Sequence, residues 1–226
     1  MHCPLIALIA AALAAPGVAA DTAHPTVIEL FQSQGCSSCP PANANVMALA
    51  DRPDLLVLSF GVTYWDQLGW KDRFARPEFT RRQYAYRDGL GHDNVWTPQT
   101  VINGRVDVTG VRAGELAQAV KAGDRGTGGP AVSATGARID IAAGKGMGDV
   151  WLVRYDPRIM QVPIKAGENG GRTLPHRNVV RELVKLGRWT GMAATWPRPT
   201  AAPGLAEAVL VQHPGGGPIL AALKLN

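Results

Sequence analysis

Residues 26–123 alternate apolar, β-branched segments with helix-compatible ones, and this alternation restricts the fold more than any other feature. Strands with few polar residues are typical of a sheet buried on both faces. Asn103-Gly104 predicts the two-residue turn of a β-hairpin. Strand–helix–strand followed by helix, hairpin and helix predicts an α/β fold. The expected elements are strands at 26–31 and 55–60, helices at 42–51, 74–87 and 111–122, and a hairpin at 100–108.

The second half of the chain has a different pattern. Residues 124–130 are rich in glycine and predict a linker between domains. Beyond it, short β-rich segments separated by turn residues predict a small β-sandwich. Residues 178–186 fit a strand or a helix equally well. The other strand candidates lie at 137–141, 149–155, 159–164, 208–212 and 219–225.

The first twenty residues predict a secretory signal peptide. Residues 5–15 are apolar, Pro16-Gly17 interrupts the run, and small residues precede Asp21. We therefore expect cleavage after Ala20 and a periplasmic or secreted protein. No later apolar segment approaches the length of a membrane span, so we expect no stable membrane insertion.

Export leaves two cysteines, Cys36 and Cys39, since Cys3 belongs to the leader. The loop they would close is too short to restrict the unfolded chain strongly, so this pair is a poor structural staple. The Cys36-Ser37-Ser38-Cys39 spacing suits redox chemistry or metal binding instead.

The position of the pair favours a reactive thiol. It follows a buried strand and leads into a helix, with Ser38 as the expected N-cap and Cys39 in the first turn. A helix start stabilises thiolates, and cysteines there have pKa values of about 3.5 to 7.5, against about 8.5 when free. We expect Cys36 to be the more exposed, attacking thiol and Cys39 to resolve the mixed disulfide. The residue before a proline resists helical angles, so we expect Pro40-Pro41 to distort this first turn and weaken the effect.

Three further residues are candidates for substrate binding. Pro98 precedes a predicted buried strand about 60 residues after the dithiol. We expect the Thr97–Pro98 bond to be cis, Pro98 to contact the dithiol, and the polar groups of Thr97 to align an incoming peptide. Trp65 follows a central strand and forms either a substrate wall or core.

The Cys-x-x-Cys motif after a strand, together with Thr97-Pro98, resembles the thioredoxin superfamily. Longer segments resemble a family of uncharacterised secreted bacterial proteins with that fold, a domain of unknown function. These segments are residues 28–42, 64–72, 167–174 and 176–181. The resemblance implies an α/β, thioredoxin-like domain at 21–123, then a smaller β-rich, sandwich-like domain at 131–226.

The function expected from these features is that of an exported thiol–disulfide oxidoreductase. Its substrates would be protein or small-molecule thiols and disulfides, with an unidentified redox partner and no cofactor. One alternative is a module binding a soft metal such as Cu or Zn, although only scattered histidines supplement the cysteines. The other is a non-catalytic interaction protein on a thioredoxin scaffold. We assign no metal ligand.

The remaining polar candidates are weaker. His176 could reach the dithiol as a base or ligand, but a surface or hydrogen-bonded structural histidine is the favoured interpretation. Glu168, Asn169 and Arg172 lie among glycines and predict a turn or an interdomain contact. The net charge of +5 is spread along the chain, and the basic segment 177–188 predicts a solvated face, so we expect no nucleic-acid binding.

Overall fold

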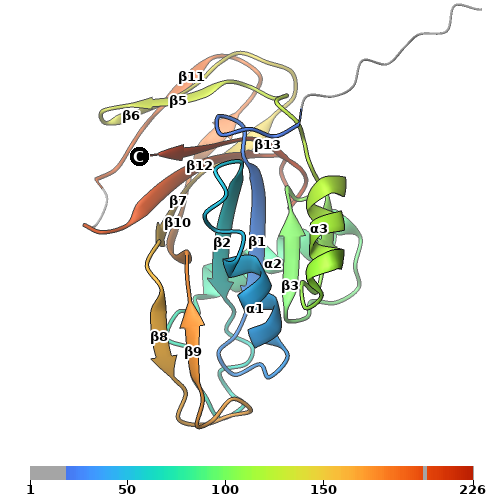
Figure 1. Ribbon diagram of the computed structural model, residues 1–226. Coiled ribbons are helices and arrows are strands. Elements are labelled where there is room, and N and C mark those ends of the chain that lie inside the picture. Colours follow the sequence, from blue (N-terminus) through green and yellow to red (C-terminus); the bar gives the residue numbers. More distant parts are fainter. Residues whose placement is uncertain (1–18, 201–202, 226) are drawn as a thin grey trace, which may run out of the picture.

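The computed structural model describes residues 19–200 and 203–225 (Figure 1). The predicted signal peptide lies outside the described residues except for Ala19 and Ala20. The first half contains β1 (Thr26–Gln32), α1 (Cys39–Met47), β2 (Leu55–Gly61), α2 (Pro77–Leu90), β3 (Gln99–Ile102), β4 (Val106–Val108) and α3 (Ala113–Ala122). The second half contains β5 (Val132–Thr135), β6 (Arg138–Ile141), β7 (Gly148–Asp156), β8 (Met160–Pro163), β9 (Thr173–His176), β10 (Val179–Trp189), β11 (Ala194–Pro197), β12 (Ala206–Gln212) and β13 (Ile219–Leu225).

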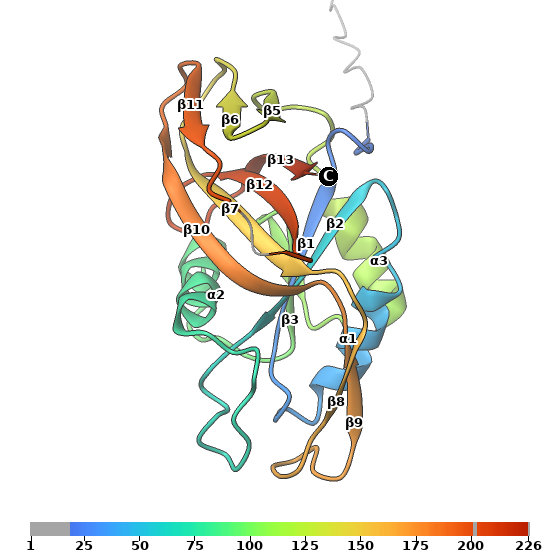
Figure 2. The ribbon, with the colours of Figure 1, turned by 90° about the vertical axis from the view of Figure 1, so that its left-hand side faces the viewer.

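Eight of these strands form one sheet in the order β13-β12-β7-β10-β2-β1-β3-β4. In Figures 1 and 2, α2 lies on one face of the sheet, whereas α1 and α3 lie on the other. Both faces of β1 are therefore buried. Val27 and Phe31 pack in the cluster that includes Phe79 of α2, whereas Ile28 and Leu30 belong to the cluster on the opposite face. This two-sided burial explains why apolar residues occupy both faces of β1 and β2, where Glu29 is the one charged residue.

The predicted fold class is wrong. The protein is mostly β, with three helices in the described residues, rather than an α/β thioredoxin-like domain followed by a smaller sandwich-like domain. The physical reason is that β7, β10, β12 and β13, from beyond the expected linker, extend the sheet begun by β1 and β2. They are not confined to a sheet of their own, because the edge of β2 needs a partner for its backbone groups.

The junction between the two halves is the contact of β10 with β2. Val179 pairs with Ser59 in parallel orientation, and β10 continues as the antiparallel partner of β7. The Ser59 N–H donates to the carbonyl of Asn178 at 2.9 Å, and the Asn178 Nδ2 donates to the Val57 carbonyl at 2.9 Å. Asn178 has a φ of 52°, a conformation that asparagine tolerates better than most residues. It therefore supplies both a backbone and a side-chain bond to β2.

Several local predictions are confirmed. The β3–β4 hairpin turns at Asn103 and Gly104, whose φ angles are 48° and 62°. Helix α1 has Ser38 as its N-cap and Cys39 as its first residue. The ambiguous segment 178–186 lies mostly within β10, so its strand interpretation is correct.

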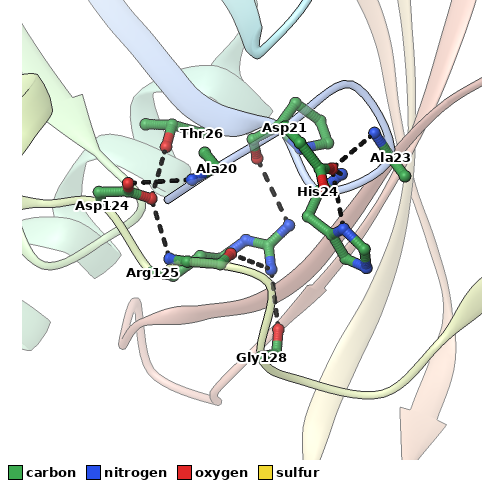
Figure 3. Close-up of polar contacts among 10 residues, drawn as sticks. Ala20, Asp21, Ala23, His24, Thr26, Asp124, Arg125 and Gly128 are labelled. Carbon is green, nitrogen blue, oxygen red and sulfur yellow. Dashed lines mark hydrogen bonds and ion pairs between the residues drawn. The ribbon is translucent and has the colours of Figure 1, made fainter. Parts of the chain in front are cut away.

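The expected linker, residues 124–130, is fixed to the start of β1. Figure 3 shows Asp124 accepting bonds from the Ala20 N–H at 3.1 Å and the Thr26 hydroxyl at 3.2 Å. Burial alone would raise the pKa of Asp124, but these bonds and one from the Gly126 N–H outweigh it and lower that pKa. Arg125 donates to the Gly128 carbonyl at 2.9 Å. The connection is thus held by polar contacts on both sides.

A buried ion pair joins α2, β1 and β12. Arg82 donates from Nε and Nη2 to the two carboxylate oxygens of Glu29, at 2.7 and 3.0 Å, and from Nη1 to Gln212 at 3.0 Å. Tyr86 also donates to Glu29. Burial opposes the charge of Arg82, but the Glu29 carboxylate outweighs it, so the pKa of Arg82 is raised. Among the described residues no helix combines the length and apolar character needed to cross a membrane.

We expect Arg82→Met to lower the free energy of unfolding by about 3–5 kcal/mol, because it leaves the Glu29 carboxylate buried without its cation. Arg81→Met, at the exposed neighbouring position, is the matched control and should change it by no more than about 0.5 kcal/mol. Guanidinium chloride unfolding measures both. Equal effects of the two substitutions would contradict a stabilising role for the pair.

Candidate dithiol site

Cys36 and Cys39 form a disulfide where β1 gives way to α1. We call residues 33–38 the dithiol loop. The Cys39 N–H donates to the Cys36 carbonyl at 3.2 Å, and Pro40 and Pro41, which follow, have no N–H. The first turn of α1 therefore offers few free N–H groups to a thiolate.

Both cysteines are buried, although Ser37 and Ser38 between them are exposed. Cys36 is 0% exposed and Cys39 1% exposed. The expectation that Cys36 is the more exposed is wrong for the disulfide form. The two residues differ instead in their neighbours. The Cys36 Sγ lies 3.3 Å from the hydroxyl of the exposed Ser38, whereas Cys39 lines a small, partly open cavity with Asn43 and His176.

The Thr97–Pro98 bond is cis, which confirms that prediction. Pro98 is buried, and the Thr97 carbonyl accepts a long bond of 3.5 Å from the Ser38 hydroxyl. Trp65 Nε1 donates to the Thr97 hydroxyl oxygen at 2.7 Å. The structure thus brings Trp65 and Thr97 together beside the dithiol loop. Both oxygens of Thr97 therefore have hydrogen-bond partners, whereas the sequence predicted that they would be free to align a peptide.

The segment between β2 and α2 holds the dithiol loop from a second side. Trp70 Nε1 donates to the Gln34 side-chain oxygen at 3.0 Å, and the Gln34 N–H donates to Asp72 at 2.8 Å. The other oxygen of Asp72 accepts from the Phe74 N–H at 2.7 Å. Asp72 is 4% exposed, and burial raises its pKa to about 6 in spite of these bonds.

A third contact comes from the second half of the chain. We call residues 165–172, between β8 and β9, the cover loop; the β8–β9 hairpin lies beside α1 in both ribbon views (Figures 1 and 2). Glu168 accepts from the Ser37 N–H at 3.0 Å and from its hydroxyl at 2.6 Å, and these bonds lower the pKa of Glu168. Asn169 is fully buried and donates to the carbonyls of Gln34 at 3.0 Å and Cys36 at 2.8 Å.

From the sequence, Glu168, Asn169 and Arg172 of the cover loop predicted only a turn or an interdomain contact. Its position against the dithiol could not be predicted, because the contacts span more than 130 residues. The one signal in the sequence that could have indicated a role for this loop was the polar pair Glu168-Asn169 between glycines. Gly167, with a φ of 72°, lies so close to Trp70 that a Cβ would sit 3.1 Å from the Trp70 Cβ.

His176, at the end of β9, differs from its favoured interpretation. It is 4% exposed, its Nε2 has no hydrogen-bond partner in the described chain, and its ring packs edge-on against Phe74 at 5.5 Å. Burial lowers its pKa to about 4, and the charge of Arg73 contributes. The ring is therefore neutral at physiological pH.

The described residues hold no group of three or more His, Cys, Asp or Glu side chains placed to bind a metal ion. A separate hollow of about 360 Å³ lies between α2 and strands β7, β10 and β12, lined in part by Arg81, Trp151 and Lys185. No cysteine borders it.

Residues 27–212 match a family described as "Protein of unknown function (DUF1223)", which confirms the expected relation to an uncharacterised family. No curated protein matches the chain. The chain is similar to the crystal structure of protein AGR_C_4864 from Agrobacterium tumefaciens, with 32% identity and a TM-score of 0.75 over 91% of this chain and 94% of that one. HBP35 of Porphyromonas gingivalis has 14% identity and a TM-score of 0.59 over 93% and 76%, a likeness of fold alone.

The raised pKa of Asp72 predicts that the free energy of unfolding depends on pH. The folded state keeps a proton on Asp72 up to a pH of about 6, whereas the unfolded chain releases it near 3.8. The free energy of unfolding contributed by Asp72 therefore falls as pH rises through this window, by about 3 kcal/mol at about 1.36 kcal/mol per unit. Asp72→Asn does not titrate and serves as the reference. Urea unfolding at pH 4 and pH 7 should show the wild type losing stability relative to the variant; a constant difference would disprove the assignment.

Removing the contacts of the cover loop should make the Cys36–Cys39 disulfide easier to reduce. Asn169→Ala removes the two bonds to the dithiol loop, at a cost of about 1–3 kcal/mol to that contact, and should expose the disulfide more often. We expect reduction by a water-soluble phosphine to be about tenfold faster or more, since about 1.4 kcal/mol corresponds to a factor of ten. Asn94→Ala, at an exposed position, should leave the rate unchanged. An unchanged rate in Asn169→Ala would show that the cover loop does not restrict access.

Proposed function

The chain belongs to the DUF1223 family of proteins of unknown function, and because that description names no activity, we propose from its own residues that it is an exported thiol–disulfide oxidoreductase. The observation that carries the proposal is the Cys36–Cys39 disulfide, whose loop is too short to act mainly as a staple. Its substrates are protein or small-molecule thiols and disulfides.

The neighbours of each sulfur support different roles for the two cysteines. Cys36 lies towards the exposed Ser37 and Ser38, so its thiolate attacks a substrate disulfide and forms a mixed disulfide. Cys39 lines the small cavity beside His176 and resolves that mixed disulfide. Two cysteine thiols are oxidised while the substrate disulfide is reduced to two thiols, and two thiols of the redox partner then restore the dithiol and are themselves joined in a disulfide. The reverse sequence oxidises a substrate.

Trp65, Thr97 and Pro98 form the proposed substrate-binding wall beside the dithiol loop. The bond from Trp65 Nε1 to the Thr97 hydroxyl oxygen holds this wall in place. The long Ser38–Thr97 contact, at 3.5 Å, is a weak bond that an incoming peptide N–H can replace at the Thr97 carbonyl.

The proposed location is the periplasm or the extracellular space, supported by the leader-like residues 1–20. Cleavage after Ala20 removes the bond from the Ala20 N–H to Asp124. Thr26 and Gly126 then still donate to that carboxylate, so the start of β1 keeps its attachment.

The test uses the protein expressed with its own leader, recovered from the periplasm and expected to begin at Asp21. The reduced wild type should reduce a disulfide-bonded protein, and Cys39→Ser should retain a mixed disulfide through Cys36, detected by mass spectrometry. Cys36→Ser is the matched control and should trap nothing. Trapping through Cys39 alone would reverse the roles.

Two other results would replace the proposal. A disulfide that exchanges with no thiol in the folded protein would leave a non-catalytic interaction protein. Stoichiometric Cu(I) or Zn binding by the reduced protein, abolished in both cysteine variants and accompanied by no exchange, would indicate a soft-metal module.

A further inference from the structure

A cavity of about 40 Å³ lies directly behind the disulfide. It lies between the end of β1, the first turns of α1 and the end of β9, and it is partly open to the surface. Its polar lining residues, beside Cys39, are Gln32, Ser33, Asn43 and His176. A water molecule needs roughly 10–15 Å³ of such space, so the cavity has room for at least one.

The polar groups around this cavity suit a bound water. The Nε2 of His176 is buried without a partner, and leaving such a group unsatisfied costs about 1–3 kcal/mol. Ser33 Oγ accepts from the Gly35 N–H at 3.1 Å, which leaves its hydroxyl proton for another acceptor. Asn43 is already used, because its Nδ2 donates to the Pro175 carbonyl at 2.7 Å. The Nε2 of Gln32 is also used, because it donates to Asn43 at 3.0 Å and to Ser59 at 2.7 Å. His176 Nε2 and the Ser33 hydroxyl are thus the groups that we assign as water ligands beside Cys39.

We propose that His176 exchanges a proton with the Cys39 thiol through a water bound in this cavity, and that this exchange sets the rate at which Cys39 resolves the mixed disulfide. The inference rests on the proposed function, and it assigns to that site a residue from the second half of the chain. Burial and the charge of Arg73 lower the pKa of His176, so the ring is neutral at physiological pH and quickly gives up any proton that it accepts.

The resolving step balances as follows. The Cys39 S–H gives its proton to the water, which passes one of its own to His176. The Cys39 thiolate attacks the Sγ of Cys36, the Cys36–Cys39 bond forms, and the bond from Cys36 to the substrate sulfur breaks. The substrate leaves as a thiolate with the bonding electron pair, and the proton on His176 returns through the water to that thiolate or to solvent.

The experiment mixes reduced protein with one equivalent of dithiobis-nitrobenzoate and follows the coloured thiolate by stopped flow. Cys36 releases the first thiolate, and Cys39 releases the second when it closes the disulfide. We expect His176→Asn to slow the second phase by about 100-fold, the usual scale for loss of a general acid–base group, with the first phase unchanged. His213→Asn, at an exposed histidine, is the matched control and should change neither phase.

Rescue separates a chemical role from a structural one. Added imidazole should accelerate the second phase of His176→Ala, and no acceleration overturns the proposal, as does an equal slowing of both phases. If neither variant folds, the imidazole ¹⁵N shifts of His176 in the wild type decide: they should change when the disulfide is reduced, and unchanged shifts overturn it. A wild type with no first phase would refute the oxidoreductase proposal itself.

Discussion

The structure depends on the place where β10 joins β2. Asn178 brings the second half of the chain onto the edge of β2 with one backbone and one side-chain hydrogen bond. From there β10 pairs with β7, and β7 with β12, so that one sheet runs through both halves. An open edge on β2 would expose unpaired backbone groups, and the join removes that liability. It also carries the β8–β9 hairpin to the end of the sheet where the disulfide lies.

Local sequence patterns predicted the elements well but not the architecture. Strands β1 and β2 and the Asn103-Gly104 turn are each encoded by a few adjacent residues, so they were predictable. The pairing of β10 with β2 is not local, because many strands present similar edges and the glycine-rich linker resembles a domain boundary. The change in composition at residues 124–130 therefore suggested a domain boundary, whereas the eight-stranded sheet takes strands from both sides of these residues.

The candidate site was likewise predictable where it depends on local sequence and not where it depends on distant contacts. Two cysteines at close spacing and a proline before a strand are recognisable in the sequence, and the structure joins them through Ser38 and Thr97. Asn169 was recognisable only as part of a turn or an interdomain contact, and His176 was a candidate base or ligand but not favoured, because a single polar residue near a turn has many uses. Their importance comes from what they face: the carbonyl of Cys36 in one case and the cavity beside Cys39 in the other.

The contact of Glu168 and Asn169 with the dithiol loop has a consequence for the order of events in a growing chain. Residues 36–39 leave the ribosome, and under the proposed export enter the oxidising compartment, long before residues 168 and 169 follow. During that interval the thiols have no covering segment, so an oxidant can join them freely. Once the hairpin arrives, the bond is enclosed. The disulfide of the newly made protein and that of the finished protein are thus the same bond with different access to its surroundings.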